Sequence, residues 1–170
     1  MERPRIKIDL TAVDYIVEIV SLLSILGAIA LYVIYWIKAP DTVPIHYNIY
    51  GEADGYGSKS EMLILPICTV LFYVGLTILN KYPHIFNFPT AVTEENVLSL
   101  YKIATRGIRW MKLLCCLLFT YMIWHEVRII INQEVPKLDG FSWIFIACIA
   151  IFPIILIVKM TKAGKKNKTI

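Results

Sequence analysis

Charged residues are scarce in this sequence. Asp, Glu, Lys and Arg make up 18% of its 170 residues, whereas an ordinary soluble domain has about 25%. Hydrophobic residues make up 58%, which is more apolar surface than a water-soluble fold of this size can bury. The composition therefore excludes an ordinary soluble domain and indicates that lipid surrounds much of the chain.

Cysteines are few, and their placement excludes a disulfide framework. All four lie inside apolar runs, and their spacing does not match a zinc site; they are Cys68, Cys115, Cys116 and Cys148. We interpret them as small apolar packing residues.

Catalytic motifs are also lacking. The sequence has no glycine-rich phosphate loop and no serine nucleophile elbow. His125 and Glu126 do not form the zinc-protease motif, because Ile129 stands where the second histidine should be. We interpret these two residues as a capping or interfacial pair and expect a non-enzymatic protein.

Four apolar runs are long enough to cross a bilayer, which takes about 20 residues. The predicted spans are residues 17–37, 62–79, 113–131 and 141–158. The first run is longer than the apolar part of a cleaved signal peptide, so we expect it to be retained. We therefore predict an all-α integral membrane bundle of four transmembrane helices, formed by residues 1–170 as a single domain.

The interiors of these spans hold no ionisable side chain. No Asp, Glu, Lys, Arg or His occurs in residues 19–37, 62–79, 113–124 or 141–158. Pumps and ion-coupled transporters usually carry such groups at membrane depth. Their absence argues against a pump or an ion-coupled transporter that acts as a monomer.

Basic residues predict the orientation of the bundle. Of the 17 lysines and arginines, 13 lie in the amino-terminal segment, in residues 80–112 or in the tail 159–170. Only four lie in residues 38–61 and in the loop after the third span. The positive-inside rule therefore places both termini and residues 80–112 in the cytoplasm, and it places residues 38–61 outside.

Residues 80–112 predict an amphipathic cytosolic helix before the third span. Thr93 is a suitable N-cap residue for this helix. Apolar residues follow at helical spacing, namely Val97, Tyr101, Ala104, Ile108 and Met111. We expect this helix, from Thr93 to Arg109, to lie on the inner leaflet or to pack beneath the bundle. The lysine-rich tail 159–170 would bind anionic lipid rather than nucleic acid.

The outer loop, residues 38–61, is the richest polar segment. Its candidate ligand-binding residues are His46, Asn48, Glu52, Asp54 and Lys59. Proline fixes φ and glycine permits positive φ, so the residues expected to shape the loop are Pro44, Gly51, Gly55 and Gly57.

Two interpretations of this loop remain open. Its side chains could hydrogen-bond one another and fold the loop over the bundle, or they could bind an ion, a peptide or a lipid headgroup. A histidine with two carboxylates suits a transition metal, so His46, Glu52 and Asp54 are candidate ligands for a divalent metal cofactor. A calcium loop of the EF-hand type is disfavoured, because Tyr50 occupies the first ligand position.

The stretch DTVPIHYNIYGEADGYGSKSEMLILP resembles the signature of a bacterial membrane family, the domain of unknown function 1648. The matching residues are Pro44, His46, Asn48, Gly51, Asp54, Gly55, Ser58, Lys59, Leu65 and Pro66. A second block, residues 83–112, resembles the region that follows the second helix in several relatives. Its matches include a cytosolic motif of Asn87, Pro89, Glu95, Asn96 and Arg106.

The resemblance implies a bacterial cytoplasmic (inner) membrane protein. Some members of the family are fused to a domain similar to the immunity protein that protects sporulating bacilli from a secreted toxin, although this chain has no obvious copy of that domain. The polar outer loop on an otherwise uncharged bundle suggests sensing of, or immunity to, an extracellular factor through that loop. The expected partners are the bilayer and an extracellular peptide or membrane protein. The alternative is a metal-binding membrane protein or metal-dependent membrane enzyme that uses His46, Glu52 and Asp54.

Overall fold

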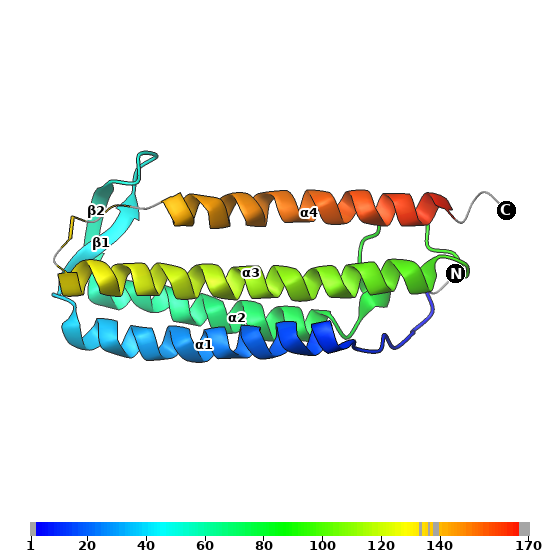
Figure 1. The fold of residues 1–170 in the computed structure, drawn as a ribbon, viewed down its shortest axis with the longest axis horizontal. Coiled ribbons are helices and arrows are strands. Elements are labelled where there is room, and N and C mark those ends of the chain that lie inside the picture. Colours follow the sequence, from blue (N-terminus) through cyan, green and yellow to red (C-terminus); the bar gives the residue numbers. More distant parts are fainter. Residues whose placement is uncertain (1–2, 133, 136, 138–139, 167–170) are drawn as a thin grey trace.

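The computed structural model describes residues 3–132, 134–135, 137 and 140–166. Within these residues four long helices run along one axis (Figure 1): α1 (Ala12–Lys38), α2 (Ile64–Leu79), α3 (Val97–Asn132) and α4 (Gly140–Lys166). The helix α3 lies between α4 and the pair formed by α1 and α2. With the short 3-10 helix η1 (Lys59–Leu63) continuing into α2, all four segments are long and apolar enough to cross a membrane.

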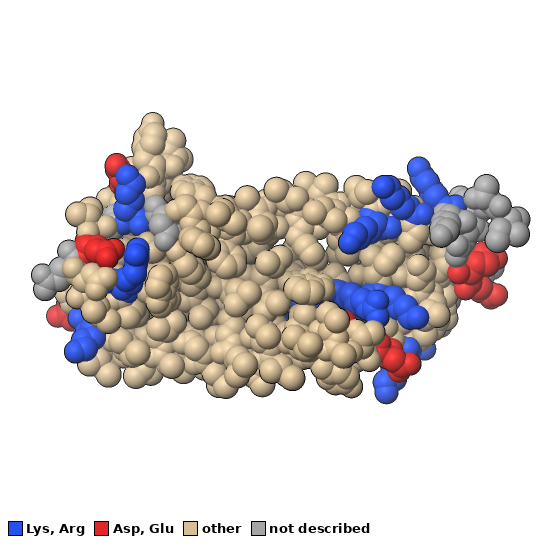
Figure 2. Space-filling view, viewed as in Figure 1, with Lys and Arg blue, Asp and Glu red and all other residues tan. Residues whose placement is uncertain are grey.

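The charged side chains gather at the two ends of the bundle. Figure 2 shows a wide uncharged band between the basic and acidic groups of one end and those of the other. Large apolar side chains such as Leu23 and Ile154 are exposed within this band. Since only lipid can cover such a surface at low cost, the protein is a multi-pass membrane protein, as the composition predicted.

The outer loop contains β structure, so the prediction of a strictly all-α fold was wrong. The strands β1 (Thr42–Tyr47) and β2 (Ala53–Ser58) pair antiparallel, with Val43 opposite Gly57 and Tyr47 opposite Ala53. This hairpin lies at one end of the bundle (Figure 1). Two features hid the strands in the sequence: Pro44 interrupts the first, and the second has glycine at two of its six positions, which are poor strand formers.

The predicted amphipathic helix and third span form one continuous helix, α3. Thr93 does not begin it; the helix begins at Val97 and runs for 36 residues. Val97, Tyr101 and Ala104 from the predicted stripe are buried, and the Tyr101 hydroxyl donates to the Pro4 carbonyl at 3.2 Å. At about 1.5 Å per residue, α3 is longer than a bilayer core, so its first turns extend beyond the apolar band.

A buried ion pair joins α1 to α3 near the end opposite the hairpin. The Lys112 ammonium lies 2.5 Å from a Glu18 carboxylate oxygen and 2.8 Å from the Thr77 hydroxyl of α2. The same ammonium sits 4.5 Å from the centre of the Tyr73 ring. Lys112 is fully buried, so these groups replace the water that it would otherwise bind.

Three cations and two carboxylates make up this cluster, which we call the buried charge cluster. Beside Lys112, the Arg109 guanidinium lies 3.4 Å from Glu18 and 3.5 Å from Asp14. The Nε of Arg106 lies 3.6 Å from Asp14. Asp14 also completes a capping box with Thr11 at the start of α1, which fixes the carboxylate in place. The cluster therefore carries one net positive charge.

The helix α4 packs on α3 through a close approach at Gly107. A Cβ atom at position 107 would lie 2.5 Å from a methyl carbon of Leu156 in α4. Leu100 and Ala104 of α3 pack with Met160 one turn further along. The first lysines of the predicted basic tail continue α4 as far as Lys166, and residues 167–170 of that tail lie outside the described residues.

We expect Gly107→Leu to lower the free energy of unfolding by about 2 kcal/mol, because the added side chain overpacks the contact with Leu156. Gly75→Leu is the matched control, since a Cβ at position 75 has no heavy atom within 4 Å and the gain in helix propensity is similar. Unfolding by SDS in mixed micelles, followed by circular dichroism, measures the difference. Adding Leu156→Ala should restore stability to Gly107→Leu; a failure to do so contradicts this packing.

Candidate binding pocket beneath the hairpin

The polar residues of the hairpin bond mainly to one another. The Asn48 side-chain oxygen accepts from the backbone N–H groups of Tyr50 at 2.8 Å and Glu52 at 3.0 Å. Gly51 has a φ of 78°, a conformation that side chains other than glycine adopt with strain. Asn48 and Gly51 therefore hold the turn between β1 and β2.

The other candidate residues of this loop form pairs of polar side chains, most of them on its exposed surface. His46 Nδ1 lies 2.5 Å from Asp54 Oδ1, and the Glu52 carboxylate lies 3.8 Å from Lys137. The Lys59 ammonium lies 3.3 Å from Asp41 and sits over the ring of Trp36. The His46–Asp54 pair joins β1 to β2, and the Glu52–Lys137 pair joins the hairpin to the segment between α3 and α4.

The predicted metal site is not supported. The structure brings His46 and Asp54 together, but the Glu52 carboxylate pairs with Lys137 instead. In the part of the chain that the structure describes, no group of three or more His, Cys, Asp and Glu residues could hold a metal ion. The metal-dependent alternative therefore has no site in the described residues.

The residues expected to shape the loop bring β1, β2 and η1 close together. Pro44 is buried and faces the bundle, while Gly55 lies against the Cβ of His46. At Gly57 a side chain would collide with the carboxylate of Glu61. Because Glu61 lies this close to β2, its carboxylate accepts a hydrogen bond from the backbone N–H of Ser58 at 2.9 Å.

A pocket of about 240 Å³ lies between the hairpin and the helices. Its walls come from β1, from η1 and the start of α2, and from α3 near Met122, with Ser142 of α4 at one side. The polar groups that line it are Tyr47, Glu61, His125, Glu126 and Ser142. The remaining walls are apolar, including Ile45, Met62 and Leu65. The pocket is therefore a small apolar chamber with a few polar groups, as binding sites usually are.

Glu126 is the central polar group of this pocket. It is 5% exposed, and one of its carboxylate oxygens accepts from the Tyr47 hydroxyl at 2.6 Å. Burial, together with the nearby Glu126 carboxylate, raises the pKa of Tyr47 far above its usual value. Tyr47 thus remains a neutral hydrogen-bond donor over the physiological pH range, and this bond fastens the hairpin to α3.

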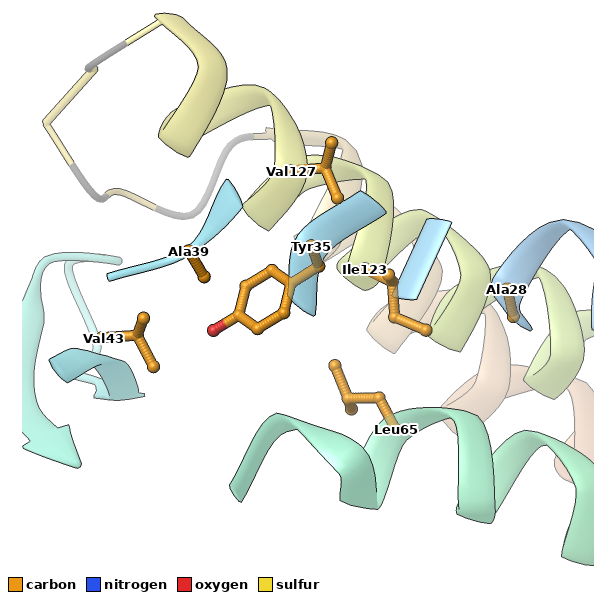
Figure 3. Packing of buried hydrophobic residues seen from close by; sticks show 7 residues of the cluster. All are labelled: Ala28, Tyr35, Ala39, Val43, Leu65, Ile123 and Val127. Atoms are coloured by element: carbon orange, nitrogen blue, oxygen red, sulfur yellow. The ribbon is translucent and has the colours of Figure 1, made fainter. Parts of the chain in front are cut away.

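Three buried polar atoms near the hairpin end have no hydrogen-bond partner among the described residues: His125 Nε2, the Tyr35 hydroxyl and Arg128 Nε. His125 is 2% exposed, and its Nε2 has no hydrogen-bond partner among the described residues. The hydroxyl of Tyr35 is also buried and has no hydrogen-bond partner among the described residues. Figure 3 shows the Tyr35 ring pointing away from α1 into the space between Val43 and Leu65. Each such atom costs about 1–3 kcal/mol when left dry, so a ligand or water is expected where His125 faces the pocket.

The charge balance of the pocket favours a cation. Two carboxylates, those of Glu61 and Glu126, line it, and no lysine or arginine from the described residues does. The exposed His46–Asp54 pair is not among the lining residues. An ammonium or guanidinium group would meet Glu126 here while its carbon chain lies on the apolar walls.

The candidate residues predicted from the sequence and the residues that line the pocket share the hairpin but are mostly different side chains. The richness of the loop in polar residues drew attention to its exposed side chains, whereas the pocket uses the opposite face. His125 and Glu126, which the sequence suggested as a capping or interfacial pair, are both buried. One signal in the sequence could have identified these pocket residues. Two adjacent ionisable residues stand at the end of an apolar run, next to a folded loop.

The second predicted motif lies at the other end of the bundle, far from the pocket. Asn96 is buried, accepts from the Thr93 backbone N–H at 2.9 Å and donates to the Ala91 carbonyl at 3.0 Å. Glu95 accepts from the Thr93 hydroxyl at 2.8 Å. Asn87 lines a shallow apolar hollow between α3 and α4. Pro89 is exposed. Arg106 belongs to the buried charge cluster. Asn96 and Glu95 thus order the turn that precedes α3.

Residues 23–70 match the family model of a domain of unknown function, DUF1648. This segment is similar to the DUF1648 family. This confirms the resemblance found in the sequence, and the matched segment includes most of α1, the whole hairpin and the start of α2. The second block, residues 83–112, lies outside the match, as do His125 and Glu126. The DUF1648 segment therefore supplies one wall of the pocket, and α3 supplies the other.

A curated relative extends the similarity beyond the DUF1648 segment. An uncharacterized protein of Archaeoglobus fulgidus is 28% identical over 151 residues, which cover 74% of this chain and 76% of the relative. No solved structure matches the chain significantly. Neither the family description nor the name of the relative assigns an activity.

Proposed function

We propose that this protein is a non-enzymatic membrane receptor or immunity protein, which binds an extracellular factor beneath its hairpin. The observation that carries the proposal is the pocket itself, where the buried side chains of Glu126 and His125 line walls that are otherwise mostly apolar. Buried ionisable groups beside a cavity are costly to fold, and they commonly mark functional sites.

The proposed orientation puts the hairpin outside the cell. Only four of the 17 lysines and arginines lie at the hairpin end: Lys38, Lys59, Arg128 and Lys137. The positive-inside rule then supports a cytoplasmic location for the opposite end and both termini. In this orientation the pocket faces the exterior of the cytoplasmic membrane, where an extracellular peptide or another membrane protein can reach it.

The proposed ligand group is a cation on an apolar stem. A lysine or arginine side chain of a peptide has this chemistry, with the ammonium or guanidinium against Glu126. The exposed residues of the hairpin, including the His46–Asp54 pair and Asn48, would contact the rest of such a peptide. The turn before α3, with Asn87, Asn96 and Pro89, would contact a cytosolic regulator.

Methionine methyl signals can test the binding site directly. Met62 and Met122 line the pocket, whereas Met111 and Met160 lie elsewhere. We expect hexylammonium to shift the ¹³C-methyl signals of Met62 and Met122 in detergent-solubilised protein, while hexanoate of the same chain length leaves them unchanged. Glu126→Gln should weaken the hexylammonium effect by about 10-fold or more, because a charge-assisted hydrogen bond is lost.

Glu52→Gln serves as the control, because it removes a carboxylate at the same end that does not line the pocket. Equal shifts with hexylammonium and hexanoate, or equal losses in both variants, would reject the pocket as a cation site. The biological role needs a separate experiment in cells. A deletion strain whose transcript profile and sensitivity to cationic peptides both match the parent would argue against sensing and immunity.

A further inference from the structure

A second cavity lies between α3 and α4, away from the hairpin. Its volume is about 340 Å³, and each helix contributes one cation and several apolar side chains to its walls. The cations are Arg106 of α3 and Lys159 of α4, and the apolar groups include Trp110, Phe152 and Ile155. The cavity thus combines two positive charges with a hydrophobic wall.

Both cations keep donors available toward this cavity. Arg106 has a 44% exposed side chain, and its Nε lies 3.6 Å from Asp14 Oδ2. A guanidinium has five N–H donors, so most of the Arg106 donors do not take part in the pair with Asp14. Lys159 is exposed and forms no ion pair with any residue that the structure describes.

The surrounding charges strengthen the attraction for an anion. Asp14 is the carboxylate nearest to Arg106, and it is shared with Arg109. Because the buried charge cluster holds three cations and two carboxylates, it does not neutralise Arg106 completely.

The depth of the cavity matches the boundary between acyl chains and headgroups. Lys159 directly follows the uncharged residues 141–158 of α4. Figure 2 shows basic side chains beginning where the uncharged band ends on this side. Trp110 is partly exposed beside the cavity, and tryptophan prefers the headgroup level of a bilayer.

We propose that this cavity binds an anionic phospholipid. The phosphate of the lipid lies between Arg106 and Lys159, and an acyl chain lies against Phe152 and Ile155. A soluble anion would satisfy the two cations but leave the apolar wall uncovered. A zwitterionic lipid would cover the wall but bring its own cation to the two positive side chains. The proposal is independent of any ligand beneath the hairpin.

Native mass spectrometry of the full-length protein tests the site. The protein is released from nanodiscs that contain phosphatidylglycerol and phosphatidylcholine in equal amounts, and the retained lipid is counted. We expect about 10-fold preferential retention of phosphatidylglycerol, since each basic residue near an anionic headgroup contributes enough for several-fold in affinity. Lys159→Gln should reduce this preference several-fold, and Arg106→Gln/Lys159→Gln should abolish it.

Lys102→Gln/Lys162→Gln is the matched control. It removes the same charge from the same two helices at exposed positions that do not line the cavity, so it should keep the preference. Equal loss in the control would show a diffuse surface effect and overturn the site, and so would equal retention of both lipids by the natural protein. Displacement of the retained lipid by millimolar inorganic phosphate would overturn the assignment to a lipid.

The single variant Lys159→Gln guards against a folding artefact, because Lys159 lies outside the buried charge cluster. Its circular dichroism spectrum and unfolding midpoint should equal those of the natural protein while the lipid preference falls. Unchanged preference in this variant would contradict the proposal.

Discussion

Glu18→Gln is expected to lower the free energy of unfolding by about 3 kcal/mol. The substitution keeps the shape of the side chain but leaves Lys112 fully buried without a carboxylate. Removing one partner of a buried ion pair typically costs 3–5 kcal/mol, and we expect the lower end because Glu18 is 25% exposed. Unfolding by SDS in mixed micelles measures the change.

A second substitution should restore most of the lost stability. Lys112→Met removes the uncompensated ammonium, so the double variant Glu18→Gln/Lys112→Met should unfold closer to the natural protein than Glu18→Gln does. The control Glu94→Gln removes a carboxylate at an exposed position and should change stability by less than about 0.5 kcal/mol. If the effects of Glu18→Gln and Lys112→Met simply add, the two residues are not coupled and the buried pair is refuted.

Tyr47→Phe is expected to cost about 2 kcal/mol and to loosen the hairpin. The variant leaves the Glu126 carboxylate buried without the hydroxyl that donates to it at 2.6 Å, and a buried unsatisfied acceptor costs about 1–3 kcal/mol or more when charged. Hydrogen exchange of the β1 amides should become faster, because the bond between hairpin and α3 is gone. Tyr56→Phe is the control on the neighbouring strand, since Tyr56 is 60% exposed.

The raised pKa of the Tyr47 hydroxyl predicts that the stability of the protein depends on pH in the alkaline range. Burial and the Glu126 carboxylate raise the pKa of Tyr47 in the folded state, while in the unfolded chain it stays near about 10. The stability that this shift contributes is therefore complete below about pH 10 and is lost as the pH rises above it, when only the unfolded chain ionises. The stability difference between the natural protein and Tyr47→Phe should shrink from pH 9 to pH 11. A constant difference would contradict the assigned environment.

The four spans could be predicted from the sequence, because hydropathy over about 20 residues reports lipid exposure directly. The partners of the charged residues that flank the spans could not. Glu18 and Lys112 are 94 residues apart, and each alone looks like a solvated residue at the edge of an apolar run. Their contact depends on the packing of α1 against α3, which no local pattern encodes.

The pocket could not be predicted from the sequence, because it too depends on contacts between segments that are far apart in the chain. Polar richness marked the outer loop in which the hairpin lies, but it did not reveal the strands. Glu126, however, becomes part of a site only because Tyr47 folds over it from a segment 79 residues away. Short strands that contain proline and glycine gave no reliable strand pattern, so the face that β1 turns toward the bundle could not be assigned.

The uninterrupted length of α3 has a thermodynamic consequence. This one helix carries Glu126 near the hairpin and Arg106 near the opposite end, so both proposed ligands bind to the same rigid element. Coupling between two sites is reciprocal: if a factor beneath the hairpin changes the affinity for anionic lipid by some ratio, that lipid changes the affinity for the factor by the same ratio. The lipid composition of the membrane would then set the concentration at which the cell responds.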